Sequence, residues 1–146
     1  MLIKDHINFS GTNPLIGPND DRYGPRFPGM ADAYTAEWRH KIKELAAERN
    51  IPLNEGVYLW ALGPCFETAA EIKMFRLLGS DAVGMSTVPE VICAAHSGMK
   101  VLGISVITNY GTGMNHSMPS HEETLREGQK AAADLTALIK AFIGEL

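Results

Sequence analysis

The sequence predicts an α/β fold, with a parallel-type sheet and flanking helices in a single domain over residues 1–146. Short apolar runs alternate along the chain with helix-like periodic segments, an order typical of parallel sheets with right-handed connections. Three of the helical segments open on an S/T-x-x-E capping box, at Thr68, Thr87 and Ser120. A chain of 146 residues is long enough to bury one sizeable core.

Composition narrows the class of protein. The chain is 45% apolar and 21% charged with a net charge of −4, and it has no Lys/Arg cluster that would bind nucleic acid. It has no apolar run of membrane-span length, and Met1–His6 lacks the apolar core of a signal peptide. Cys65 and Cys93 fit no zinc or CxxC pattern. We therefore expect reduced thiols in a cytoplasmic protein with neither a membrane nor a nucleic acid as partner.

The N-terminal part begins with a predicted strand over residues 1–7. Residues 8–30 follow as a Gly-, Pro- and Asn-rich loop. A loop of this length in a compact domain is uncommon and is often functional. Tyr23, Phe27 and Met30 are large apolar groups in this loop, and we expect them to pack against other residues.

Two helix–strand units follow the loop. Asp32 is expected to cap a helix that runs to about Asn50, and residues 56–62 then form a strand rich in aromatic and branched side chains. The capping box at Thr68 opens a second helix, which stops at Gly79. The apolar positions of the first helix recur at spacings of three and four: Tyr34, Trp38, Ile42 and Leu45.

The C-terminal part repeats the alternation. Residues 81–85 form a short buried strand, and Thr87 caps a helix over 88–97 with Pro89 in its first turn. Lys100–Thr108 is apolar on both faces, as a central parallel strand should be. After a Gly-rich loop, Ser120 opens the last helix.

The strand-to-helix turns predict a binding cleft. In open α/β sheets, ligands bind at the carboxyl ends of the strands. We therefore expect Phe66–Glu67, Met85–Ser86 and Thr108–Asn109 to converge on one cleft, with His121 nearby.

The residue types at these turns favour a planar heterocycle. Glu67 either accepts a ligand N–H or merely favours a helix dipole, and Asn109 either binds a heterocycle edge or bonds its own turn. Phe66 and Met85 are either core residues or apolar walls for a flat ring. Ser86 lies where free helix amides form an anion or hydroxyl site. Together they indicate a base-binding pocket.

Other chemistries have weaker support. No paired carboxylates indicate a glycosidase, and the segment 84–88 lacks the last Gly of a G-x-S-x-G elbow. His116, His121 and Glu122 do not have the spacing of a metalloprotease signature, so we expect no metal.

Longer motifs carry a family resemblance. Gly63–Thr68, Val83–Glu90 and Ile107–Asn109 closely resemble signature segments of the trimeric purine nucleoside phosphorylases. Shorter stretches resemble the same family: Lys4–Asn8, Gly17–Asp20 and Arg26–Pro28. The resemblance implies a cytoplasmic, trimeric glycosyltransferase of purine salvage. Such an enzyme cleaves inosine or guanosine with phosphate as co-substrate and without a cofactor, giving the base and ribose 1-phosphate.

The resemblance also implies roles for individual residues. Glu67 accepts from the purine ring N–H, and Asn109, preceded by Thr108, bonds the imidazole side of the base and suits a 6-oxopurine. The related methylthioadenosine phosphorylases typically carry Asp there. Ser86 contacts phosphate. The remaining implied contacts are with the base and ribose: Phe66 and Met85 on both, His121 at the 5′-hydroxyl, Tyr58 near the sugar, and Phe27 in a neighbouring subunit's ribose site.

The chain departs from this family in length. It resembles only the C-terminal half, so the expected N-terminal phosphate-binding half is absent and Ser86 is the remaining phosphate ligand. Two alternatives to an active enzyme therefore stand: a non-catalytic purine-binding remnant, and a structural half that needs a complementary chain. An exposed apolar sheet edge and self-association are also expected.

Overall fold

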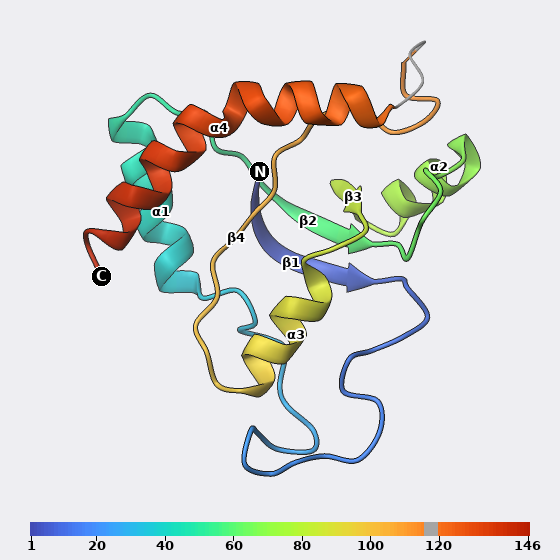
Figure 1. Ribbon diagram of the computed structural model, residues 1–146, viewed down its shortest axis with the longest axis vertical. Helices are drawn as coiled ribbons and strands as arrows, with labels where there is room; N and C mark the ends of the chain where they lie inside the picture. The colour runs from blue at the N-terminus through green and yellow to red at the C-terminus, as the bar shows by residue number, and fades with distance from the viewer. Residues whose placement is uncertain (116–119) are drawn as a thin grey trace.

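The structure, a computed structural model, describes residues 1–115 and 120–146 (Figure 1). Strands and helices alternate strictly along the chain: β1 Leu2–Asn8, α1 Ala36–Glu48, β2 Glu55–Trp60, α2 Ala69–Leu77, β3 Ala82–Gly84, α3 Val88–His96, β4 Gly103–Ile104 and α4 His121–Ile143.

The strands form one four-stranded sheet in the order β3-β2-β1-β4. β2 pairs in parallel with β1 on one side and with β3 on the other, whereas β4 pairs antiparallel with β1. The prediction of an α/β fold with a mostly parallel sheet is confirmed.

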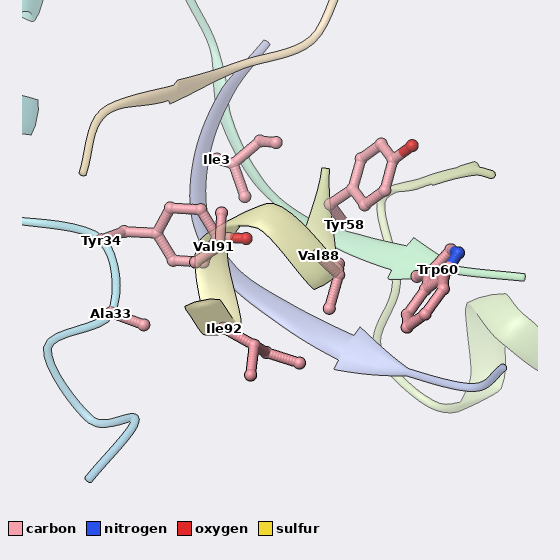
Figure 2. Close-up of a cluster of buried hydrophobic side chains, with 8 residues drawn as sticks. All are labelled: Ile3, Ala33, Tyr34, Tyr58, Trp60, Val88, Val91 and Ile92. Carbon is pink, nitrogen blue, oxygen red and sulfur yellow. The ribbon is translucent and has the colours of Figure 1, made fainter. Parts of the chain in front are cut away.

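Helices cover both faces of the sheet because successive strand side chains point to opposite sides. Ile3, Tyr58 and Trp60 pack with α3 on one face (Figure 2). Leu2 belongs to the cluster formed with α1 and α4, and Leu59 to the cluster formed with α2. The sheet therefore lies between two helical layers, with α3 alone on its side.

The prediction that Lys100–Thr108 forms a central parallel strand is wrong. Only Gly103–Ile104 forms a strand, and this strand lies at the sheet edge, antiparallel, rather than at the centre in parallel. Neighbouring backbone groups pair outside the ladder: Val101 N donates to Thr35 Oγ1 (3.0 Å), and Ser105 N donates to Met1 O (2.9 Å). Val101 packs partly on the cluster with α3, and Leu102 and Ile104 pack partly on the cluster with α1 and α4, so this apolar run does not require a central strand.

Two predicted caps are also wrong. Asp32 does not begin α1, which starts at Ala36 after Thr35, whose hydroxyl accepts from Val101 instead of capping the helix. Thr87 precedes α3 with a φ of 73° and makes no side-chain cap bond. N-caps require an extended backbone, and Thr87 lies in the left-handed region. At Thr68 the full capping box forms as predicted, and Ser120 Oγ accepts from Glu123 N.

The long loop packs only in part. Met30 lies against the buried cluster that includes Ile3 and Tyr34. Tyr23 and Phe27, by contrast, are 65% and 87% exposed, so this chain by itself leaves most of their surface uncovered. None of the helices that the described residues form combines the length and the hydropathy of a bilayer crossing.

Leu138 tests the packing of α4 on α1. It is fully buried against Leu2 and Ile42, so Leu138→Ala leaves a cavity. We expect this change to lower the free energy of unfolding by about 2–5 kcal/mol. The neighbouring Ile139 is exposed, and Ile139→Ala is the matched control, with an expected loss below about 1 kcal/mol. Equal losses for both variants, measured by urea denaturation, would contradict this packing.

Thr68 tests the capping box of α2. Its hydroxyl accepts from Glu71 N, and Thr68 N donates to the Glu71 carboxylate, which holds the pKa of Glu71 below its usual value. We expect Thr68→Ala to destabilise the protein by about 1 kcal/mol, and Thr68→Ser to restore most of that loss. Thermal denaturation measures both changes, and a neutral Thr68→Ala would refute the role of this cap.

Candidate functional site

The turn after β2 lies directly against the elbow between β3 and α3. Ala61 N donates to Gly84 O (3.0 Å), which continues the β2–β3 pairing beyond Trp60. Gly63 packs on the Met85 side chain so closely that a Cβ at residue 63 would lie 2.5 Å from the Met85 sulfur. The two turns therefore form one continuous surface at the carboxyl ends of β2 and β3.

The third predicted segment reaches this surface by a different route. Since β4 runs antiparallel, its carboxyl end points away from the ends of β2 and β3. The chain nevertheless returns, because Gly111 packs on Ile72 and Gly113 on Ala69, both in α2. Residues 111–113 consequently lie beside α2, the helix that follows Phe66–Glu67.

The elbow between β3 and α3 has an unusual backbone. A positive φ is rare and costly for a β-branched residue such as Thr87. Ser86 is exposed, and its Oγ lies 3.1 Å from Thr87 Oγ1, so the two hydroxyls stand together before the first turn of α3. This pair of hydroxyls at a helix start can donate to an anion or to a sugar hydroxyl.

The ring-binding candidates differ in exposure. Phe66 and Met85 are 46% and 40% exposed, which leaves apolar surface open beside the half-buried Glu67. Asn109 is half-buried, with its Oδ1 accepting from Thr108 Oγ1 (2.9 Å) and its Nδ2 donating to Tyr110 O (3.0 Å). Since Nδ2 carries two hydrogens, one donor of Asn109 stays available for a ligand.

The three other predicted residues occupy different environments. Tyr58 is only 4% exposed and packs in the core with Ile3, Trp60 and Val88 (Figure 2). Its hydroxyl lies close against the Gly84 backbone. His121 is exposed at the first position of α4. Phe27 lines a separate cavity of about 460 Å³ together with His6 and Ile92.

His6 gives that separate cavity a polar wall. Its Nδ1 lies 3.1 Å from the Tyr34 hydroxyl, and the two rings meet edge to face. Burial lowers the pKa of His6, and the nearby Asp5 carboxylate opposes this shift. The cavity therefore presents a largely neutral imidazole near pH 7.

Two glycines that sequence reasoning passed over shape the candidate site. Gly63 makes room for Met85, and a Cβ at Gly84 would lie 2.0 Å from the Tyr58 hydroxyl. Both follow or end an apolar strand, where a glycine marks a close approach of the backbone. The location of these glycines at the ends of strands is therefore the sequence feature that could have indicated their role.

Metal binding has no support in the part of the chain that the structure describes. Across residues 1–115 and 120–146, no three His, Cys, Asp or Glu side chains are grouped closely enough to hold an ion. His116, one of the three possible ligands considered above, lies outside these ranges. Cys65 and Cys93 are both free and exposed.

Known proteins match this chain along almost its whole length. A profile described as the phosphorylase superfamily matches residues 1–144. The purine nucleoside phosphorylase 1 of Bacillus subtilis (strain 168) is 49% identical over 145 residues, which cover 99% of this chain and 54% of the relative. The purine nucleoside phosphorylase of Rattus norvegicus is also 49% identical, over 98% of this chain and 52% of the relative.

Solved structures agree with the sequence matches. Isoform 2 of purine nucleoside phosphorylase from Schistosoma mansoni, in complex with cytosine and ribose-1-phosphate, has a TM-score of 0.94 at 41% identity. The match covers 99% of this chain and 53% of the Schistosoma chain. A Schistosoma purine nucleoside phosphorylase in complex with hypoxanthine has a TM-score of 0.95 at 37% identity, with 99% of this chain and 54% of that one covered.

The sheet order, the convergent turns and these matches lead to one assignment. The chain spans about half the length of the relatives it matches. It belongs to the phosphorylase superfamily, in which its similarity lies with the purine nucleoside phosphorylases.

Proposed function

We propose that this chain is the base- and ribose-binding part of a purine nucleoside phosphorylase, formed by one domain over residues 1–146. The reaction breaks the bond between the ribose and a 6-oxopurine and forms a bond from ribose to phosphate, giving the free base and ribose 1-phosphate. The packing of Gly63 on Met85 carries the proposal, because it joins Phe66, Glu67 and Met85 in one surface suited to a flat ring.

Charge development explains the proposed roles of Asn109 and Glu67. As the glycosidic bond breaks, negative charge accumulates on the purine, and a donor fixed near the imidazole side stabilises the transition state more than the ground state. Thr108 orients the Asn109 amide by donating to its Oδ1, which leaves Nδ2 as that donor. Glu67 accepts the ring N–H and holds the base in register.

Phosphate and ribose complete the proposed site. Ser86 and the start of α3 face the phosphate, and His121 is assigned to the ribose 5′-hydroxyl. Tyr58 supports the ribose side from beneath Gly84. Phe27, with 87% of its surface exposed, is free to reach the ribose site of a neighbouring copy in a trimer.

A second candidate function has its own observation. Large apolar side chains are exposed on α2 and on either side of it in the chain: Leu62, Met74, Leu77 and Leu78. Where such side chains gather in one patch, they mark a surface that packs against another protein. We therefore retain the alternative of a structural half that is completed by a complementary chain, with or without weak purine binding.

Inosine cleavage tests the proposed function directly. We expect the purified chain to release hypoxanthine from inosine only when phosphate is present, because phosphate is the group that accepts the ribose. Release is measured with and without phosphate. Release that is independent of phosphate would indicate hydrolysis. No release, together with a guanine-dependent rise in melting temperature, would indicate a purine-binding remnant.

Asn109 tests the stabilisation of the leaving base. We expect Asn109→Ala to lower kcat for inosine by about 10²–10³, the usual effect of removing one transition-state donor. Asn109→Asp should shift preference toward 6-aminopurine nucleosides, because a carboxylate accepts where the amide donates. Asn54→Ala is the control, since Asn54 is exposed before the opposite end of β2. Unchanged kcat in Asn109→Ala would exclude the assigned role.

A further inference from the structure

The outer part of the long loop lies on the C-terminal end of α3 (Figure 1). A Cβ at Gly24 would lie 2.0 Å from the carbonyl oxygen of His96, the last residue of α3. Only a glycine allows this approach, because the obstructing atoms belong to a helix backbone that cannot move aside. The loop is therefore packed against the helix at this point.

A partly buried hydrogen bond reinforces this contact. His96 is 9% exposed, and its Nε2 lies 3.1 Å from Asn19 Oδ1. Asn19 Nδ2 donates to Gly24 O (2.9 Å) and to Asp21 Oδ1 (2.7 Å), so both of its hydrogens are used. Asn19 Oδ1 must then accept, and the His96 proton must reside on Nε2. Each group in this set of hydrogen bonds therefore has a single assignment as donor or acceptor.

Gly24, the loop residue closest to Phe27 in this group of hydrogen bonds, stands three residues before it. The Phe27 side chain buries little surface of its own and contacts the Arg26 guanidinium, 5.2 Å from the ring centre. Its position thus depends on the backbone anchors on either side, which are Gly24 on α3 and Met30 in the core. Leu15 also packs on the core, so without the anchor at Gly24 the free part of the loop would extend from Leu15 to Met30.

We propose that Asn19 and His96 are positioning residues, whose hydrogen bond fixes the loop on α3 and thereby sets the place of Phe27. The consequence for catalysis rests on the proposed function, in which Phe27 contacts ribose. Helix α3 begins next to Ser86 and ends at His96, so one rigid element fixes both the proposed phosphate contact and the loop.

Limited trypsin digestion tests the tether without requiring activity. Arg22 and Arg26 are exposed cleavage sites within the tethered segment. We expect Asn19→Ala and His96→Leu to raise the cleavage rate at these sites about tenfold, since loss of one hydrogen bond shifts local opening by that order. His96→Gln retains a donor near the Nε2 position and should stay within about twofold of the wild type.

Asn13→Ala provides the matched control for the digestion. Asn13 lies in the same loop, but its side chain accepts only from Leu15 N in an exposed local turn. It should leave the cleavage rate at Arg22 and Arg26 unchanged. If Asn19→Ala is cut no faster than this control, the tether is refuted. Asn19→Ala also decides the question should His96→Leu fail to fold.

A double-mutant cycle with inosine tests the consequence for Phe27. We expect Phe27→Ala to raise KM and Asn19→Ala to raise it by a smaller factor with little change in kcat. Asn19→Ala should have no further effect in the Phe27→Ala background, because both act through one contact. Independent, multiplicative effects would overturn the positioning role. If the wild-type chain cleaves no inosine, the proposed function fails, whereas the digestion rates still decide the tether.

Discussion

Parallel pairing of β2 with both of its neighbours is the constraint on which the rest of the structure depends. The register that sets Trp60 opposite Gly84 brings the two strand ends level. Tyr58 then lies beneath Gly84, and the turn at Gly63 meets Met85. Because strand side chains alternate, the same pairing also divides the core between α3 on one face and α1, α2 and α4 on the other. The register of β2 with its neighbouring strands therefore determines both the candidate site and the division of the core.

Helix α3 connects the two parts of the molecule that carry candidate function. Its first turn follows the Ser86–Thr87 hydroxyl pair, and its last residue holds the long loop through Asn19. The strained φ of Thr87 and the absence of a Cβ at Gly24 are local costs at the two ends of this helix. Both costs are offset by the buried face of α3, where Val88, Val91 and Ile92 pack on the sheet (Figure 2). Because α3 is well packed, it holds both the hydroxyl pair before its first turn and the loop at its last residue in place.

The reliability of sequence-based prediction here depended on how local the physical signal was. The capping box at Thr68 involves atoms within four residues, and it forms as predicted. At Thr87 the same motif fails, because the sharp turn from β3 imposes a positive φ before the side chain can cap. The run 100–108 failed for the opposite reason. Its apolar residues Val101, Leu102 and Ile104 pack partly on two different clusters, and such packing does not specify whether backbone groups bond to a strand, to Thr35 or to Met1.

The sequence by itself determined the alternation of strands and helices, the parallel character of the sheet and the residue types at the strand ends, since periodicity and capping are properties of neighbouring residues. Only the tertiary structure decided that β4 is an antiparallel edge, that residues 111–113 return to α2, and that Asn19 meets His96 across 77 positions of chain. Contacts of such separation depend on how whole elements pack, and no local pattern of side chains encodes them.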